Sequence, residues 1–205
     1  MHNKSNRRWL REHFSDPYVK KAHREGLRSR AVFKLQEIQE RDKLFKQGMT
    51  VVDMGAAPGG WSEYVSQLVG KAGRVIACDI LPIKPISGVE FIQGDMNDPL
   101  FIQTILQRVT IGTVDWVISD IAPNLSGIES VDQARTIQLA ELVLQFALQA
   151  LTAKGGLLIK IFQGDGFDDF LTEIKCHFGK VVIRKPKASR DRSREVYILA
   201  KMMRL

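Results

Sequence analysis

The stretch Val51–Gly60, which reads Val-Val-Asp-Met-Gly-Ala-Ala-Pro-Gly-Gly, decides the fold of this chain. It begins as a short apolar run, which is typical of a strand buried on both faces of a parallel sheet. The run then breaks into a turn with three glycines and one proline, and a helical pattern opens at Trp61. A strand, a glycine-rich turn and a helix in this order let backbone approach a ligand at the helix N-terminus. The stretch therefore predicts an α/β fold with a ligand site.

The glycine turn differs from the Gly-x-Gly-x-x-Gly pattern of dinucleotide-binding proteins, because three residues that include Pro58 separate Gly55 from Gly59. Proline removes one N–H donor and stiffens the loop, which suits an adenosine-bearing ligand without a pyrophosphate. A strand-to-helix turn without any ligand also fits this motif when it is taken alone. A nicotinamide-dependent oxidoreductase shares the fold class and stays an alternative, although no hydride-handling pair is visible in the sequence.

Apolar runs of strand length alternate with helical patterns along the chain. Strands are predicted over Thr50–Met54, Arg74–Asp79, Val89–Gln93, Val114–Ser119, Leu157–Phe162, Lys180–Arg184 and Glu195–Lys201. Helices are predicted from Pro17 toward Gly26, from Ala31 through Ile38, over about Trp61–Val69, from Asp98 to about Arg108, over about Val131–Leu151 and over Phe167–Phe178. This alternation predicts a mostly parallel, seven-stranded sheet with helices on both faces. We expect one domain over residues 1–205, with a basic N-terminal extension at about 1–40.

Carboxylates stand at or just after the ends of three successive predicted strands, at Asp79, Asp95 and Asp120. In an open α/β sheet the ligand lies beyond the carboxyl ends of the strands. Asp79 is placed to accept hydrogen bonds from ribose hydroxyls, and Asp95 is placed to meet an adenine amino group. Together these residues predict an acidic pocket that suits a cationic ligand such as a sulfonium. For any one of them, a purely structural cap is an equally good explanation.

Lys160 lies in the middle of a predicted strand that is otherwise apolar on both faces. Burying an amine is costly unless it has a partner or a task. Asp120 ends a strand that we expect to neighbour Lys160, Glu195 opens the last strand, and Lys34 comes from the N-terminal helix. These four residues predict an acid–base cluster in which a lysine is held between carboxylates. A lysine that reaches solvent at the sheet edge is the alternative.

Charge is unevenly distributed along the chain, whose formal net charge is +7. Residues 1–34 hold ten Lys and Arg residues against three acidic ones, and residues 180–205 hold nine against two, so that residues 35–179 are acidic. Aromatic residues interleave the first basic segment at Trp9, Phe14, Tyr18 and Phe33. Two basic ends predict a polyanionic partner, with RNA favoured over DNA, although solvated surface faces would give the same pattern.

Several classes of protein lack support in the sequence. Cys78 and Cys176 are isolated, and the four histidines form no ligand pattern, so we expect no metal. No apolar run approaches the roughly 20 residues of a membrane span, and the first residues lack the apolar core of a secretory signal. We therefore expect a cytoplasmic protein without a membrane partner.

Four separated motifs of this chain resemble, in order, the FtsJ/RrmJ family of ribosomal RNA 2′-O-methyltransferases. The motifs are Leu27–Leu35, Asp53–Ser62, Ser119–Asn124 and Ser193–Tyr197, and the similarity covers nearly the whole chain. The resemblance implies a Rossmann-like methyltransferase fold that binds S-adenosyl-L-methionine, without a metal. It also implies ribosome biogenesis as the process, with methylation of a uridine ribose in the A-loop of 23S rRNA, within the large subunit, by a monomer. Transfer RNA, an mRNA cap and a non-catalytic RNA-binding assembly factor remain alternatives.

The resemblance assigns roles residue by residue. Its catalytic Lys-Asp-Lys-Glu tetrad falls on Lys34, Asp120, Lys160 and Glu195, and its cofactor positions fall on Gly59, Trp61, Asp79, Asp95 and Asp120. Within the tetrad, Lys160 is our choice as the base that takes the ribose hydroxyl proton. A free lysine has a pKa of about 10.4, and we expect burial and the nearby Lys34 cation to lower it.

Overall fold

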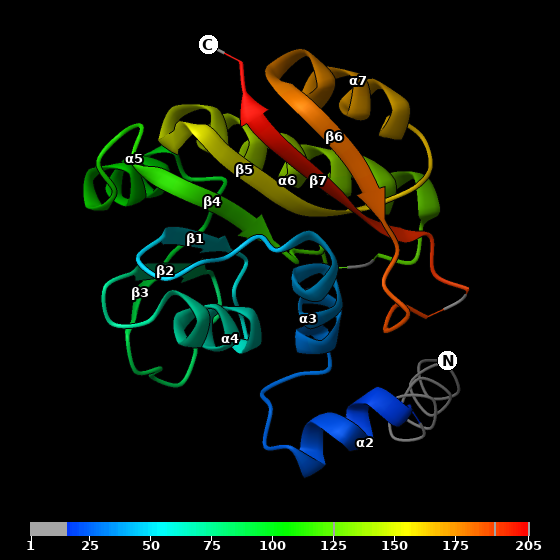
Figure 1. The fold of residues 1–205 in the computed structure, drawn as a ribbon. Coiled ribbons are helices and arrows are strands. Elements are labelled where there is room, and N and C mark those ends of the chain that lie inside the picture. The colour runs from blue at the N-terminus through cyan, green and yellow to red at the C-terminus, as the bar shows by residue number, and fades with distance from the viewer. Residues whose placement is uncertain (1–15, 125, 191, 205) are drawn as a thin grey trace.

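A seven-stranded sheet forms the centre of the protein, and helices cover both of its faces (Figure 1). The computed structural model describes residues 16–124, 126–190 and 192–204. The strands are β1 (Thr50–Met54), β2 (Arg74–Asp79), β3 (Val89–Gln93), β4 (Val114–Ser119), β5 (Leu151–Phe162), β6 (Phe178–Arg184) and β7 (Glu195–Met203). The helices are α2 (Pro17–Arg24), α3 (Ala31–Asp42), α4 (Gly60–Val69), α5 (Pro99–Arg108), α6 (Glu129–Ala150) and α7 (Phe167–His177).

The strand order is β3-β2-β1-β4-β5-β7-β6. Strands β1 to β5 run parallel, and β7 runs antiparallel to both β5 and β6. The predicted mostly parallel sheet is therefore confirmed, with the reversal confined to its C-terminal edge. Because the chain moves from β1 to β2 and β3 on one side and to β4 on the other, strand order reverses between β1 and β4. Ligands of open α/β sheets bind at such a point.

The predicted start of β5 is wrong by six residues, because Gly155 and Gly156 lie inside the strand rather than in a turn before it. Gly156 pairs with Trp116 of β4 and with Lys201 of β7. A Cβ atom at Gly156 would lie 2.5 Å from the Trp116 ring, so a larger residue does not fit there. This glycine allows close approach of backbone and ring, which is a second use of glycine in strands.

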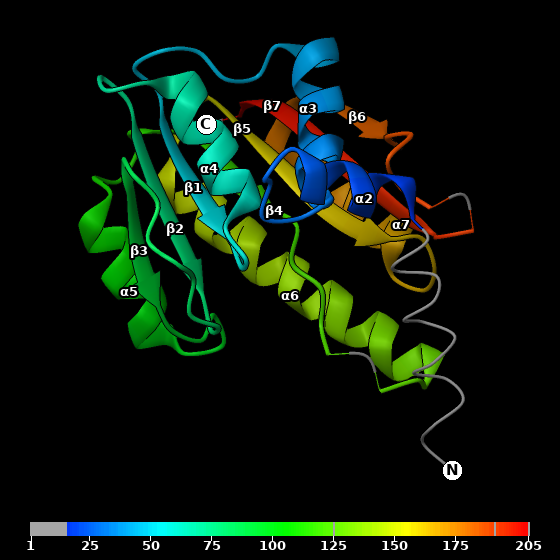
Figure 2. The same ribbon diagram turned by 90° about the horizontal axis from the view of Figure 1, so that it is seen from below.

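Two apolar layers fill the space between the sheet and its helices. One contains α5, α6 and α7 residues such as Ile105, Leu144 and Phe170, and the other contains α3 and α4 residues such as Leu35 and Val65. Seen from below, α3 and α4 lie on the face opposite α5 and α6 (Figure 2). The sheet is thus buried on both faces, as its near-continuous apolar strands predict.

Capping residues define the starts of two helices. The Asp16 side chain accepts a hydrogen bond from Tyr18 N–H before Pro17, and Asp98 accepts one from Leu100 N–H before Pro99. The first fifteen residues of the predicted basic extension, including Trp9 and Phe14, lie outside the described residues. Within the part of the chain that is described, no helix combines the length and apolar character that a membrane crossing needs.

Candidate active site

A cavity of about 620 Å³ opens at the carboxyl ends of β1, β2, β3 and β4. It lies at the point of strand reversal, where the topology predicts a ligand. Its wall includes Gly55, Ala57, Asp79, Ile80, Leu81, Gly94, Asp95, Met96, Asn97, Asp120, Ile121, Ala122, Pro123, Asn124, Arg135, Gln138 and Leu139. The structure thus brings three predicted carboxylates, from three different strands, to one cavity.

The glycine turn supplies backbone to this cavity. Gly55 has φ +82°, and a Cβ atom there would lie 2.7 Å from Cβ of Ile121, so a side chain would clash with the opposite wall. Gly59 has φ +96°, but it is not among the lining residues, and the nearest atom to a Cβ there would be Ile86 Cδ1 at 2.8 Å. Both positions therefore require glycine, one facing the cavity and one in the second layer.

Asp79 and Asp95 shape the cavity wall as well as lining it. Asp79 accepts the N–H groups of Ala57 and Leu81 with its two carboxylate oxygens, each at 2.8 Å. Asp95 accepts the backbone and side-chain N–H groups of Asn97 at 2.9 Å, and these bonds lower its pKa. Ionised carboxylates held in this way retain lone pairs for hydroxyl or amino groups of a ligand.

Trp61 does not line the cavity, in contrast to its predicted role as a cofactor contact. Its side chain is buried, its indole N–H donates to the Ala31 carbonyl at 2.8 Å, and its ring packs against Tyr197 with centroids 5.7 Å apart. Trp61 therefore fastens α4 to α3. Its contact with a cofactor stays a prediction.

The four predicted catalytic residues converge from α3, β4, β5 and β7. Lys160 Nζ lies 3.0 Å from Asp120 Oδ1 and also donates to the Asp120 carbonyl oxygen. Lys34 Nζ lies 2.7 Å from Glu195 Oε1 and 4.0 Å from Asp120 Oδ1. All four side chains are largely buried, and Asp120, the most accessible of them, opens onto the cavity. The cluster therefore adjoins the proposed ligand site.

The sequence-based expectation that Lys160 is held between two carboxylates needs correction. Lys160 pairs with Asp120, whereas Glu195 pairs with Lys34, so Lys34 is the lysine between two carboxylates. The register explains the difference, because Lys160 lies opposite Tyr197 in β7, and Glu195 lies two pairs further along, opposite Phe162. The order of contact is thus Lys160, Asp120, Lys34, Glu195.

Two residues that we did not predict support this cluster. The buried hydroxyl of Tyr197 donates to Asp120 Oδ1 at 2.7 Å, and burial raises the pKa of Tyr197 well above its usual value. The buried hydroxyl of Ser189 donates to Glu195 Oε1 at 2.8 Å. Tyr197 is part of the predicted Ser193–Tyr197 motif, which gave a signal for its position, whereas nothing in the pattern around Ser189 distinguished it.

Asp120 stays ionised in spite of its surroundings. Burial, the largest influence, raises its pKa, but Lys160, Lys34 and the Tyr197 hydroxyl together outweigh burial and lower it below the usual value. Asp53 of β1 shows the opposite outcome, because burial raises its pKa to about 7 in spite of a 2.5 Å hydrogen bond from Ser62. Two neighbouring strands thus carry one carboxylate that stays ionised, Asp120 beside the cavity, and one that holds a proton up to about pH 7, the buried Asp53.

The two basic segments of the chain meet beside the cluster. Arg30 donates to Asp16 and to the Ala188 carbonyl, and Arg190 Nε lies 3.6 Å from Asp16 Oδ2. A small apolar cluster of Ala22, Phe33 and Ala188 packs at the same junction. Segments that are more than 150 residues apart therefore pack together at an Arg30–Asp16–Arg190 junction next to Ser189 and Glu195.

No group of three or more His, Cys, Asp or Glu side chains able to hold a metal occurs in residues 16–124, 126–190 and 192–204. The cavity does fit S-adenosylmethionine in its chemistry. The φ-positive Gly55 admits a ligand close to backbone, and carboxylates line a wall that would face a cation. Asp79, Asp95 and the backbone of Gly55 and Ala57 are the groups that would hold it.

Comparison with known proteins finds a family match over nearly all of the described chain. The sequence pattern of FtsJ-like methyltransferases matches residues 27–203. A protein described as a ribosomal RNA methyltransferase from Plasmodium falciparum has a similar fold, with a TM-score of 0.76 and 24% identity over 86% of this chain and 98% of its own. A protein described as an rRNA methylase from Clostridium thermocellum gives a TM-score of 0.56 at 19% identity, over 82% of this chain and 96% of its own.

Proposed function

Because this chain belongs to the FtsJ-like methyltransferase family, we propose that it methylates a ribose 2′-hydroxyl of RNA with S-adenosylmethionine as donor. The observation that supports this best is the ion-paired cluster of Lys34, Asp120, Lys160 and Glu195 beside an acidic cavity. RNA is the substrate class because DNA lacks the reacting hydroxyl. Both structural relatives are described as acting on ribosomal RNA.

The finer assignment follows the family resemblance. The substrate is a uridine ribose in the A-loop of 23S rRNA, within the large ribosomal subunit, and the enzyme is a cytoplasmic monomer. Residues 1–205 then form one methyltransferase domain with a basic N-terminal extension. A transfer RNA or cap substrate would use the same catalytic residues, so the modified nucleotide must be mapped directly.

Lys160 is the proposed base. When bound, S-adenosylmethionine supplies an electrophilic methyl group on a sulfonium. A ribose hydroxyl is a weak acid, so its proton must leave as the oxygen–methyl bond forms and the carbon–sulfur bond breaks. Lys160 Nζ, in its neutral form, accepts that proton, and the carboxylate and carbonyl oxygens of Asp120 hold the amine in position. A buried, positioned site favours a reaction that neutralises charge.

Lys34 and Glu195 have a positioning role. Their ion pair is buried, and Ser189 orients the carboxylate of Glu195 from the second basic segment. The junction of the two basic segments at Arg30 and Arg190 lies beside them, and its cations would contact phosphates. RNA affinity should therefore fall steeply as salt is raised, since phosphate contacts release counterions.

A pair of variants separates chemistry from cofactor binding. Lys160→Ala should lower methyl transfer to RNA by about 10³-fold, and it should bind S-adenosylmethionine within about twofold of wild type, since Lys160 does not line the cavity. Asp79→Ala should weaken cofactor binding by about tenfold, because it removes a cavity carboxylate and two loop hydrogen bonds. Isothermal titration calorimetry measures binding, and transfer of a labelled methyl group measures activity.

The same labelled donor identifies the substrate. Free rRNA and intact large subunits are incubated in parallel, and the modified ribose is mapped in each. Near-normal turnover by Lys160→Ala would contradict the assigned base. Tight RNA binding by wild type without methyl transfer to any RNA would contradict the proposed reaction and favour a non-catalytic RNA-binding factor.

A further inference from the structure

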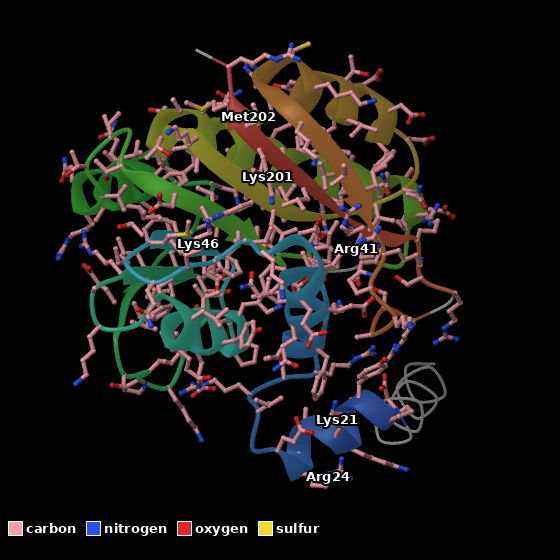
Figure 3. All side chains as sticks on the ribbon, viewed as in Figure 1. Lys21, Arg24, Arg41, Lys46, Lys201 and Met202 are labelled. Atoms are coloured by element: carbon pink, nitrogen blue, oxygen red, sulfur yellow. The ribbon has the colours of Figure 1, made fainter. Side chains whose placement is uncertain are left out.

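A second group of cations lies at the end of α3 that is remote from Lys34. We define the β6–β7 basic patch as Arg41, Lys46, Lys180, Arg184 and Lys201, which come from α3, the loop after it, β6 and β7. Figure 3 labels Arg41, Lys46 and Lys201, and all three lie on the side of the sheet that carries α3. The patch draws on residues outside the basic N-terminal segment, and no step of the proposed reaction uses it.

The patch contains repulsion between like charges, which Asp42 offsets only in part. Lys180 and Lys201 lie directly opposite each other on the antiparallel strands β6 and β7. Like charges at directly opposite positions destabilise a sheet. Burial lowers the pKa of Lys201, and Lys180, Arg184 and Lys46 lower it further, against a raising influence from Asp42. Lys201 is held in place by the Asp42 carbonyl at 3.1 Å and by the Trp116 ring at 5.5 Å.

The nearby carboxylate does not neutralise the patch, because it is committed to one arginine. Asp42 accepts two hydrogen bonds from Arg184, at 2.8 Å from Nε and 2.6 Å from Nη2. Such a bidentate pair is geometrically specific and satisfies both carboxylate oxygens. Lys46 and Lys180 are exposed, and Arg41 is exposed at the same end of α3. The patch therefore presents net positive charge to solvent.

The patch is also at a useful distance from the catalytic cluster. Lys201 is four residues from Tyr197 along β7, which corresponds to about 13 Å of extended strand. Because Tyr197 contacts Asp120, the patch lies within the span of a few nucleotides from the cluster.

We propose that the β6–β7 basic patch binds the phosphate backbone of the RNA substrate, a few nucleotides away from the methylated ribose. This inference rests on the proposed RNA methyltransferase function and adds a contact surface beyond the catalytic cluster and the Arg30–Arg190 junction. RNA phosphates would relieve the repulsion between Lys180 and Lys201. These lysines then lower the stability of the free protein but strengthen its binding to RNA.

The double variant Lys46→Gln/Lys180→Gln tests the patch and leaves Lys201 with its structural contacts. The control, Lys71→Gln/Lys175→Gln, removes the same charge from the turn before β2 and from α7 on the opposite face. Binding of a fluorescein-labelled RNA hairpin with a single-stranded loop is measured by anisotropy between about 50 and 200 mM salt. The patch variant should reduce the slope of log affinity against log salt by about 2 and weaken binding about tenfold at low salt.

The control should keep the wild-type slope to within about 0.5, since its lysines make no phosphate contact. The patch variant should melt at or above the wild-type temperature, because it removes repulsion, and should bind S-adenosylmethionine as wild type does. Equal slopes in the patch variant and wild type would overturn the proposal. So would equal reductions in patch and control variants, because they would indicate a general charge effect.

These outcomes are independent of the proposed reaction. If the patch variant shows the expected smaller slope but wild type methylates no RNA, the proposed function fails and the patch stands as an RNA contact. If wild type methylates RNA and the three slopes are equal, the patch proposal fails and the proposed function stands.

Discussion

Asp53 and Asp120 lie at the carboxyl ends of neighbouring strands, yet the protein shifts their proton affinities in opposite directions. Both are penalised by burial. For Asp53 hydrogen bonds from Ser62 alone leave burial dominant, and the pKa rises to about 7. For Asp120 two lysines and a tyrosine hydroxyl reverse the effect, and the pKa falls. The comparison shows that charge in this site is set by the partners that other elements supply.

The two carboxylates also influence each other. The charges of Asp120 and Asp79 raise the pKa of Asp53 further, so three carboxylates share the end of the sheet. An acidic environment of this kind is disfavoured in the free protein and becomes favourable when a cation binds. The cavity is thus prepared for a positively charged ligand, whereas the Lys34–Lys160 side is balanced internally by its ion pairs.

Among the variants that test this comparison of Asp53 with Asp120, the largest effect is expected from Asp120→Asn. The amide keeps the shape of the side chain but removes the charge that holds Lys160 and Lys34, so methyl transfer should fall by about 10²-fold or more. Two buried amines would lose a counter-charge, which should cost about 3 kcal/mol in the free energy of unfolding. Single-turnover methyl transfer and urea denaturation measure the two effects.

Asp115→Asn is the matched control in the same strand. Asp115 accepts the Thr50 N–H at 2.8 Å at the opposite end of β4, and an asparagine oxygen can keep this bond. It should transfer methyl groups at the wild-type rate. If Asp120→Asn were as active as this control, the secure charge of Asp120 would have no catalytic purpose.

A smaller effect, dependent on pH, is expected from Asp53→Asn. Because the pKa of Asp53 is about 7 in the folded protein and 3.8 for an ordinary Asp, native Asp53 retains a proton that the unfolded chain releases as pH rises from about 4 to 7. Wild-type stability from this group is therefore greatest below pH 4, falls through this window and is constant above it. Between pH 5 and pH 8, the free energy of unfolding of Asp53→Asn should therefore rise by about 2 to 3 kcal/mol relative to that of wild type.

Urea denaturation of both proteins at several pH values checks this prediction. Asp120 does not interfere in that window, because a lowered folded pKa gives stability that is lost only as pH falls below about 4. Parallel stability profiles for wild type and Asp53→Asn between pH 5 and 8 would show that Asp53 is ionised throughout. The contrast between the two carboxylates would then disappear.

Much of this arrangement could be predicted from sequence, because the cavity carboxylates stand at the ends of strands that apolar runs define. The bounds of β1 to β4 follow from apolar runs ending in Asp or Gly, and chain order places Asp79, Asp95 and Asp120 at one edge. Burial of Lys160 followed from the apolar residues on both sides of it in β5. These features depend on local pattern and on the rule that ligands bind at the carboxyl ends of strands.

Other features depend on register and contact, which local pattern does not specify. The antiparallel register of β5 and β7 places Glu195 two pairs beyond Lys160, and the packing of α3 brings Lys34 rather than Lys160 to it. Gly156 lies in β5 because it pairs with both β4 and β7, and the Trp116 ring fills the space that its side chain would need. A serine such as Ser189 is common in basic loops, so its bond to Glu195 becomes visible only in three dimensions.

The smallest effect is expected from Tyr197→Phe, which tests whether the charge of Asp120 needs more than its lysines. The variant removes one buried hydrogen bond to a carboxylate, at 2.7 Å, and keeps the ring that packs on Trp61. Loss of such a bond costs about 1 kcal/mol, so methyl transfer should fall about fivefold, with cofactor affinity unchanged. The pKa of Asp120 should rise, because the hydroxyl helps to lower it, and NMR titration of the ¹³C-labelled Asp120 carboxyl measures this shift. Tyr64→Phe, a partly buried tyrosine on α4, is the control and should keep both the rate and the Asp120 titration. An unchanged Asp120 titration in Tyr197→Phe would show that the lysines alone keep Asp120 charged.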